Sequence, residues 1–262
     1  MYRDIAVSIA ARVGTIAIDR ADANNSVRAE TMEDLRDALQ RLAADPAVRV
    51  IVLTSLGKHF VAGAEFSFLE SLATTPALQV KDQVYENFQG AARALWHCPK
   101  PTLAAFSGAA ITVGCELALA CDFRIVSETA YFQESWIKLG LLPPLGGLML
   151  LPRFVGLGVA SDMVLRGRVM RANEALRLGL VQEVVSVEGL AQRLESFAAE
   201  LADIAPQAYA AAKQGLHRGL ESTMEREWAN NVLAQAMLLG ANDFREGLDA
   251  VTGKRAPKFS GT

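Results

Sequence analysis

Cysteine, histidine and net charge are all scarce in this chain. It has three cysteines and three histidines among 262 residues, and its formal net charge is −3. So few cysteines, with no C-x-x-C pair, do not build a disulfide scaffold, and the scattered histidines lack metal-ligand spacing. A weakly acidic chain gives no reason to expect nucleic acid or an anionic membrane as a partner. We therefore expect a reducing compartment, no metal and no nucleic acid.

Long uninterrupted hydrophobic runs are also missing. Hydrophobic residues make up 51% of the chain, yet no apolar stretch reaches the length of a membrane span. Near the N-terminus, Arg3, Asp4 and Arg12 leave no continuous signal-peptide core. These absences predict a soluble, cytoplasmic protein with no membrane partner.

Residues 101–122 (PTLAAFSGAAITVGCELALACD) carry the most informative pattern. An apolar segment typical of a strand is followed by a helix that is hydrophobic all round except for Glu116. A helix of this kind is buried, so Glu116 is predicted to lie in the first turn of a helix without a solvent face. Burial raises the pKa of a carboxyl group toward neutrality, where a general acid or base works best.

Glu116 has a second interpretation, as a cap of its helix. A capping box needs Ser or Thr three residues before the acid, and that position is Val113. We therefore favour proton transfer. The free N–H groups of the same first turn, at residues 112–114, are suited to an anion, and the small residues 62–64 let another stretch of backbone approach a ligand closely. Together they predict a site that stabilises an enolate.

Strands and helices are predicted to alternate over the first two-thirds of the chain, and only helices follow. Predicted strands cover residues 5–9, 13–17, 48–55, 102–106, 123–127 and 180–185. Predicted helices cover residues 29–44, 79–96, 158–165, 172–178, 189–202, 207–220 and 223–241, with one more ending near 155. This order favours an α/β core at residues 1–186 and a helical part at 187–262.

Six segments, in this order, carry a family resemblance. They are NNS at 24–26, HFVAGAEF at 59–66, SGAAITVGCELALACDFRI at 107–125, LGLLPPLGG at 139–147, EALRLGLVQEVV at 174–185 and EGLDAVTGKRAPKF at 246–259. Over nearly its full length the chain resembles the crotonase superfamily, in its enoyl-CoA hydratase/isomerase family. The resemblance implies an α/β fold, a spiral of ββα units with a C-terminal helical part for oligomerisation. It also implies a homotrimer or a dimer of trimers.

The resemblance further implies an acyl-CoA thioester as substrate, with no cofactor beyond the coenzyme A that the substrate carries. The thioester oxygen would be held by the N–H groups of Ala64 and Val113, and Glu116 would move the proton. The residues predicted to contact substrate are Asp22, Ala23, Ala62, Glu65, Phe66, Trp136, Pro143, Lys254 and Phe259. The basic tail around Lys254 is equally well explained as a solvated charge run.

Two positions depart from the family pattern. Val113 replaces a glycine, and its branched side chain resists a positive φ and narrows the pocket. Trp136 stands where hydratases of the family have a second glutamate. Glu134 lies two residues earlier, and its role stays open, as does that of His59 in the acyl-CoA loop. Losing one acid/base group typically lowers a rate by about a hundredfold to ten-thousandfold.

Two hypotheses follow from these departures. In the first, the protein is an acyl-CoA enzyme that uses one carboxylate for isomerisation, decarboxylation or specialised hydration. In the second, it is a non-catalytic acyl-CoA-binding protein in which Trp136 fills the water site. The buried acid Glu116 favours the enzyme, because a binder has no need of it. The dehalogenase branch of the family also carries an aromatic residue here, but its aspartate eight residues later is Pro144 in this chain.

Overall fold

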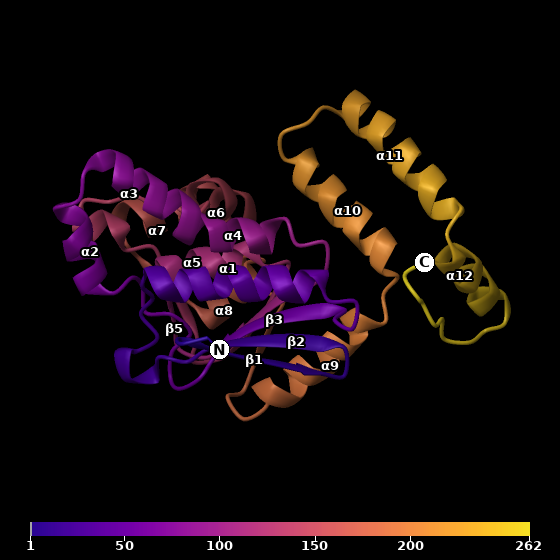
Figure 1. Cartoon of the computed structure of the whole chain (residues 1–262), viewed down its shortest axis with the longest axis horizontal. Coiled ribbons are helices and arrows are strands. Elements are labelled where there is room, and N and C mark those ends of the chain that lie inside the picture. Colours follow the sequence, from indigo (N-terminus) through magenta and orange to yellow (C-terminus); the bar gives the residue numbers. More distant parts are fainter. Residues whose placement is uncertain (1) are drawn as a thin grey trace.

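A six-stranded sheet crosses the body of the protein, seen in a computed structural model that describes residues 2–262 (Figure 1). Its strand order is β1-β2-β3-β4-β6-β9, with β1 and β2 antiparallel and every other pair parallel. The strands are β1 (Ile5–Ala10), β2 (Val13–Ile18), β3 (Val50–Ser55), β4 (Thr102–Phe106), β6 (Phe123–Ser127) and β9 (Glu183–Val185). All six predicted strands are confirmed, although the last begins three residues later than expected.

The helices of the described residues are α1 (Ala29–Ala44), α2 (Phe66–Ala73), α3 (Ala77–Gln83), α4 (Gln89–Trp96), α5 (Val113–Ala120), α6 (Gly147–Val155), α7 (Leu157–Arg166), α8 (Ala172–Arg177), α9 (Leu190–Ala202), α10 (Pro206–Gly219), α11 (Met224–Leu239) and α12 (Asn242–Thr252). Of these, α1, α4 and α5 pack on one face of the sheet and α9 on the other. The helix predicted at residues 29–44 is confirmed at both ends. The helices α2 and α12 were not predicted.

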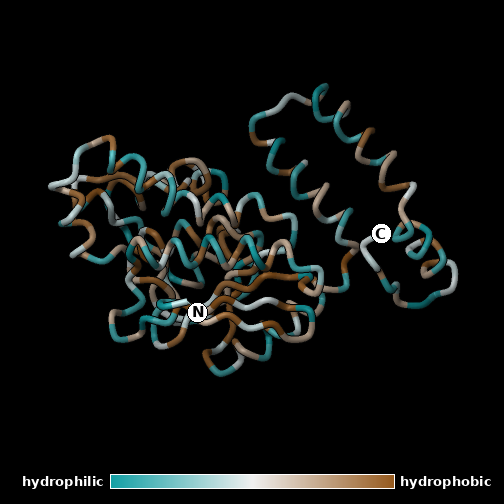
Figure 2. The backbone as a smooth tube through the Cα atoms, in the orientation of Figure 1, coloured by the Kyte–Doolittle hydropathy of each residue, from teal (hydrophilic) through white to brown (hydrophobic). Residues whose placement is uncertain are grey.

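Alternate residues of the parallel strands face two separate hydrophobic clusters. In β3, Ile51 and Leu53 belong to the larger cluster with α1, α4 and α5, whereas Val50 and Val52 pack against α9. This division follows from the two-residue repeat of a strand, which sends neighbouring side chains to opposite faces. Because both of their faces are covered, β3 and β4 consist mainly of buried apolar residues, and brown segments run through the body in Figure 2.

A second, three-stranded sheet brings two distant segments together beside α5. It consists of β5 (Ala109–Ile111), β7 (Tyr131–Gln133) and β8 (Val169–Arg171), with β7 in the middle. Ile111 pairs with Gln133, and the Thr112 N–H donates to the Gln133 carbonyl over 2.8 Å. The residues after β7 are thereby placed next to the first turn of α5.

The segment predicted as one long helix over residues 79–96 is divided. The helix α3 continues into a π-helical turn, Val84–Phe88, and then into α4. The helices α2 and α3 stand at the end of the molecule farthest from the C-terminus, and α4 leads back toward its middle (Figure 1).

The C-terminal helices differ in how they meet the body. The helix α9 packs on the sheet, while α10 to α12 extend to one side (Figure 1). The helix α10 touches the body through an ion pair of 2.8 Å between Lys213 and Asp122, and through stacking of His217 on Trp96. The prediction that only helices follow residue 187 is confirmed. Among residues 2–262, no helix is both long and apolar enough to cross a membrane.

Candidate active site

The helix α5 carries Glu116 in its first turn, as the sequence predicts. All eight residues of α5 are buried, and the exposed fraction of Glu116 is 1%. Below the helix, the fully buried Arg124 donates hydrogen bonds to the carbonyls of Ala118 and Cys121, which satisfies acceptors at the C-terminal end of α5. A cation at that end also suits the helix dipole. The sequence therefore fixes α5 rigidly inside the core.

Three donors surround the carboxylate of Glu116. Its Oε2 atom accepts from the backbone N–H groups of Leu145 and Gly147, over 2.6 and 2.9 Å. Its Oε1 atom accepts from the indole Nε1 of Trp136 over 3.2 Å. A side chain at Gly147 would crowd the carboxylate, since a Cβ atom there would lie 3.2 Å from Oε2. Glycine at this position therefore lets the turn close over Glu116.

Glu116 is poised to gain or lose a proton near neutral pH. Burial raises its pKa from 4.5 to about 7, although the hydrogen bonds from Gly147, Leu145 and Trp136 each act to lower it. The cost of burying the charge therefore outweighs the donors that stabilise it. A carboxyl group with such a pKa can act as a general base or, once protonated, as a general acid.

A second buried carboxyl group, that of Glu134, lies next to Glu116. Glu134 follows β7 directly, and neither of its carboxylate oxygens has a hydrogen-bond partner among residues 2–262. Burial, and then the charge of Glu116, raise the pKa of Glu134 well above its usual value. Burial, followed by Glu134, also raises the pKa of Cys115. Both the burial of Glu134 and the nearby charge of Glu116 therefore favour its neutral, protonated form.

The backbone donors predicted at Ala64 and Val113 come from two segments in contact. A Cβ atom at Gly114 would lie 2.6 Å from the carbonyl oxygen of Val61, so glycine allows the start of α5 to approach the loop that holds Ala64. Among residues 2–262, neither the Ala64 N–H nor the Val113 N–H donates to another group. Both are free to donate to a ligand.

The positive φ of the turn before α5 lies on Thr112, one residue before Val113. Val113 has ordinary helical geometry, while Thr112 adopts φ 48° and ψ −105°. A β-branched residue with positive φ is uncommon and costs about 1–3 kcal/mol. Val113 thus keeps a negative φ, as its branched side chain favours, and the turn places the positive φ on Thr112.

A cavity of about 610 Å³ opens between the Ala64 loop and the helices α2 and α3. It is lined by Ala64, Phe66, Phe68, Leu69, Glu70, Leu72, Ala73, Val80, Val84, Phe88, Trp136, Leu139, Leu141, Leu142 and Pro144. Nearly all of these side chains are apolar, which suits a hydrocarbon chain. We call this cavity the acyl chamber. It joins Ala64, Phe66 and Trp136, three of the residues that the sequence analysis singled out.

Other residues predicted to contact substrate are spread more widely. Asp22 and Ala23 form a surface 3₁₀ turn, and Ala62 is half-buried in the loop before Ala64. Pro143 is buried, and its neighbour Pro144 lines the acyl chamber instead.

The predicted tail residues are distant from this group. Lys254 and Phe259 lie in the C-terminal helical part, at the opposite end of the chain from α2 and α3 (Figure 1). Phe259 packs near Gly247 of α12. Within one chain the structure does not bring Lys254 and Phe259 to the acyl chamber, so their role stays a prediction that needs a neighbouring subunit.

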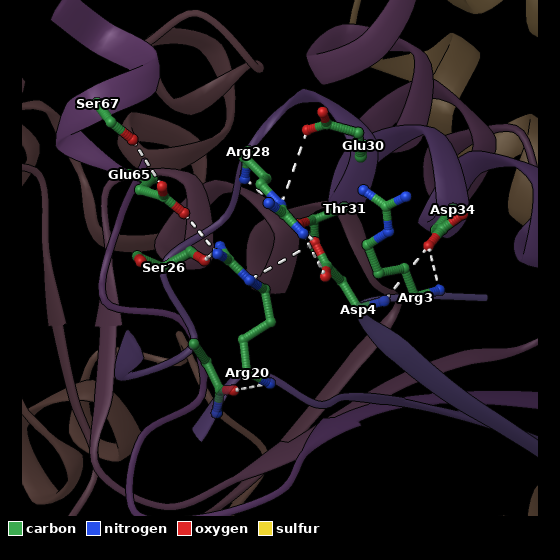
Figure 3. Close-up of polar contacts among 11 residues, drawn as sticks. Arg3, Asp4, Arg20, Ser26, Arg28, Glu30, Thr31, Asp34, Glu65 and Ser67 are labelled. Carbon is green, nitrogen blue, oxygen red and sulfur yellow. Dashed lines mark hydrogen bonds and ion pairs between the residues drawn. The ribbon is translucent and has the colours of Figure 1, made fainter. Parts of the chain in front are cut away.

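Two ionisable side chains near the site, those of Glu65 and His59, have contacts that the sequence did not suggest. Glu65 was predicted to contact substrate, but its Oε2 atom pairs with Arg20 over 2.5 Å (Figure 3). His59 accepts a hydrogen bond from the Ala109 N–H at Nδ1, and burial lowers its pKa. His59 is therefore a neutral residue that ties its loop to β5. Among residues 2–262, no group of His, Cys, Asp and Glu side chains could hold a metal ion.

Comparisons with known proteins show which family and which solved structures the chain is similar to. The sequence model of a family described as enoyl-CoA hydratase/isomerase matches residues 8–262. A protein of Rhizobium meliloti (strain 1021), named "Probable enoyl-CoA hydratase", is 36% identical over 258 residues, which cover 98% of each chain. The crotonyl-CoA hydratase of Syntrophomonas wolfei is 31% identical, again over 98% of each chain.

A solved structure extends the comparison to the fold. The enoyl-CoA hydratase of Bacillus anthracis superposes with a TM-score of 0.91 at 32% identity, covering 99% of this chain and all of the other. The crotonase-type α/β fold predicted from the sequence motifs is therefore confirmed.

Proposed function

Because this chain belongs to the enoyl-CoA hydratase/isomerase family, we propose that it moves a proton on an acyl-CoA thioester, with Glu116 as its one acid/base group. The observation that carries the proposal is a buried carboxyl group with a pKa of about 7, whose Oε1 atom accepts from a side chain of the acyl chamber. That side chain is Trp136. Coenzyme A enters only as part of the substrate.

The acyl chain lies in the chamber, and the thioester oxygen accepts hydrogen bonds from Ala64 and Val113. Glu116 in its carboxylate form removes a proton from a carbon that is acidified by the thioester. The electron pair of the broken C–H bond passes into the conjugated system, and the negative charge reaches the thioester oxygen. Each backbone donor to such an oxyanion is worth about 3 kcal/mol of transition-state stabilisation.

The protonated Glu116 then returns its proton to a different carbon, and the carbon–carbon double bond moves. One carboxyl group suffices for this sequence, because it acts first as base and then as acid. Isomerisation is therefore the reaction that we favour. Decarboxylation of a malonyl-type thioester belongs to the same chemistry, since loss of CO₂ leaves the same enolate at the same two donors.

Ordinary hydration receives less support from the side chains present. Hydration needs a second group to activate or hold water, and Trp136 has an N–H donor but no basic atom. Glu134 is enclosed, its pKa is raised by burial and then by the charge of Glu116, and it is not among the residues that line the chamber. The carboxyl group of Glu134 is thus not placed as the second glutamate of a hydratase.

The alternative is a non-catalytic acyl-CoA-binding protein. It is favoured by one observation, the hydrogen bond by which Trp136 occupies Oε1 of Glu116. In such a protein the indole would seal the carboxyl group away from the thioester.

We also propose that residues 187–262 form the oligomerisation part of a trimer or of a dimer of trimers. Large apolar side chains of α11 and α12 are exposed in the single chain, among them Met224, Trp228, Val232, Leu233, Met237, Phe244, Leu248 and Val251. Such a surface calls for a partner. In that assembly the tail with Lys254 and Phe259 would reach the coenzyme A of a neighbouring subunit. Light scattering coupled to size exclusion tests the subunit number.

The direct test is turnover of paired substrates. Wild-type protein is given trans-2-enoyl-CoA and 3-enoyl-CoA thioesters of short to long chain, and products are separated by chromatography. Interconversion of the two, without appreciable 3-hydroxyacyl-CoA, supports the proposal. Rapid formation of 3-hydroxyacyl-CoA would establish a hydratase, and binding by calorimetry without any turnover would establish the binder.

A further inference from the structure

Backbone hydrogen bonds fix the chain on both sides of Ala64. The Val27 N–H donates to the Gly63 carbonyl over 2.9 Å, and the Glu65 N–H donates to the Val27 carbonyl over 2.8 Å. These two bonds make a parallel bridge between Val27 and Ala64. The orientation of the Ala64 N–H therefore depends on how firmly Val27 and Glu65 are held.

The guanidinium group of Arg20 holds both neighbours at once. Its Nη2 atom pairs with Glu65 Oε2 over 2.5 Å, and its Nη1 atom donates to the carbonyl of Ser26, the residue before Val27 (Figure 3). Its Nε atom lies 3.5 Å from Oδ2 of Asp4. All three nitrogens of the guanidinium group are therefore engaged inside the chain, and Arg20 is not available to bind a phosphate of the substrate.

Asp4 and Arg28 support Arg20 from the side of α1. The buried carboxylate of Asp4 accepts two hydrogen bonds from Arg28, each 2.9 Å long, and one from Thr31 (Figure 3). The pKa of Asp4 is lowered, because these contacts outweigh the effect of burial. The network thus joins the residue before β1, the loop after β2 and the start of α1.

Asn25 ties the same loop to the other side of the site. It is fully buried, its Oδ1 atom accepts from the Arg20 N–H, and its Nδ2 atom donates to the carbonyls of Leu56 and His59. The segment that leads into Ala64 is therefore held at both of its ends.

Glu65 also stands at the boundary between the Ala64 loop and α2. Its Oε1 atom accepts from Ser67 over 2.6 Å, and it is the last residue before α2 begins (Figure 3). Hydrogen bonds from Ser67 and Arg20 lower the pKa of Glu65, so it is a carboxylate at neutral pH. The side chain is 30% exposed and that of Arg20 is 13% exposed, so water screens the pair only partly.

We infer that Arg20 and Glu65 are positioning residues whose ion pair holds the Ala64 N–H in line for the thioester oxygen. The inference rests on the proposed function, in which that N–H stabilises the enolate. Neither side chain touches the reacting atoms. Misplacing the donor weakens the transition state more than the bound substrate, because the negative charge on the oxygen develops only as the reaction proceeds.

The test compares Arg20→Gln, Glu65→Gln and the double variant with wild type. Glutamine keeps the size of the glutamate and removes only its charge. Glu183→Gln is the matched control, because Glu183 pairs with Arg193 over 2.7 Å with a similarly exposed side chain (32%), but lies in β9, outside the site. We expect each single variant to lower kcat about tenfold or more with KM within about twofold. Arg20→Gln also removes the contacts with Ser26 and Asp4, so we expect the double variant to lose no more than Arg20→Gln alone.

Two further readouts separate positioning from loss of folding. Hydrogen exchange at residues 60–66 is expected to rise about tenfold in both single variants, with α9 unchanged. The CoA thioester of 4-dimethylaminocinnamic acid serves as the probe of the N–H itself, since its absorption moves to longer wavelength when its carbonyl is polarised. We expect the probe to show its full absorption shift when bound to wild type or Glu183→Gln. When bound to the Arg20 and Glu65 variants, its absorption should shift less.

The outcomes are distinguishable. The inference would be overturned if Glu65→Gln gave the full spectral shift and unchanged hydrogen exchange at residues 60–66. It would also be overturned if hydrogen exchange rose as much in α9 as at residues 60–66. If wild type does not bind the probe or any enoyl-CoA, the proposed function fails. In that case the inference about the thioester fails with it, while the exchange data still decide whether the pair holds residues 60–66.

Discussion

The indole N–H of Trp136 donates a hydrogen bond of 3.2 Å to Oε1 of Glu116, and this contact connects the acyl chamber with the acid. Trp136 occupies the position at which the sequence analysis looked for a second glutamate. Instead of an acid, this position has a donor that stabilises the charged form of Glu116. Its N–H therefore lowers the pKa of Glu116 from the still higher value that burial alone would give.

Replacing Trp136 with Phe is predicted to raise the pKa of Glu116. The ring is kept and the N–H is lost, and a hydrogen bond to a charged group is worth about 1.5–3 kcal/mol, or about one to two pKa units. The midpoint of the pH–rate profile, or of the ¹³C carboxyl titration, should move up accordingly. Trp228→Phe is the control, because Trp228 is 60% exposed on α11. Unchanged midpoints in both variants would mean that the Trp136 hydrogen bond does not form in solution.

Stability is predicted to fall as the pH rises from about 4.5 to about 7. The folded state binds the Glu116 proton more tightly than the unfolded state, because the pKa of Glu116 is about 7 in the folded protein and 4.5 for an unperturbed glutamate, as in the unfolded chain. The stabilisation is therefore complete below pH 4.5 and is lost as the pH rises to 7, by about 3 kcal/mol for this group. Urea denaturation across this pH range should show a smaller loss of unfolding free energy in Glu116→Gln than in wild type. Equal pH dependence in both proteins would contradict a raised pKa at Glu116.

Replacing Glu134 with Met is predicted to stabilise the protein. The substitution keeps the length of the side chain and removes two buried oxygens that have no partner among residues 2–262, which typically cost about 1–3 kcal/mol. The gain should grow as the pH rises, because burial, and then the charge of Glu116, raise the pKa of Glu134 and make its ionisation unfavourable in the folded state. Denaturation at pH 7 and pH 9 measures both effects, with the exposed Glu128→Met as control. A large loss of stability would show that Glu134 has a partner, such as water.

Replacing Leu72 with Trp is predicted to shorten the acyl chains that the protein accepts. Leu72 lines the chamber, and a larger side chain fills part of its 610 Å³. Each methylene group that no longer fits loses about 0.8 kcal/mol, which is about fourfold in kcat/KM. Leu78→Trp is the matched control, because Leu78 is a leucine of the neighbouring helix α3 that is 75% exposed. Equal effects on short and long chains would place the acyl group elsewhere.

The sequence was informative wherever a local pattern decides the structure. The helix α1 was predicted from its apolar spacing, and Glu116 from a helix that lacks a polar face. The helix α2 was missed because its sequence, FSFLESLA, is short and has no side-chain cap. The π-helical turn at Val84–Phe88 was also missed, because its hydrophobic pattern does not differ from that of an ordinary α-helix.

The site contacts that were missed all join residues far apart in the chain. Glu134 comes close to Glu116 because β7 pairs with β5, a register that no local pattern specifies. Arg20 and Glu65 are 45 residues apart, in two loops, and their ion pair has no sequence signature. Glu65 was therefore assigned to the substrate on resemblance alone. A buried acid can be predicted from its own helix, but its partners depend on the tertiary fold.

The most direct test of the central claim is deuterium exchange into an acyl-CoA thioester in D₂O, followed by NMR, with wild type and Glu116→Gln side by side. The account predicts that wild type exchanges the protons that the thioester acidifies. It also predicts that Glu116→Gln loses at least about a hundredfold in exchange rate, while calorimetry shows unchanged affinity. Two results would contradict the role of Glu116 as the acid/base group. One is deuterium exchange that continues in Glu116→Gln, and the other is a wild-type protein that binds the thioester but does not exchange its protons.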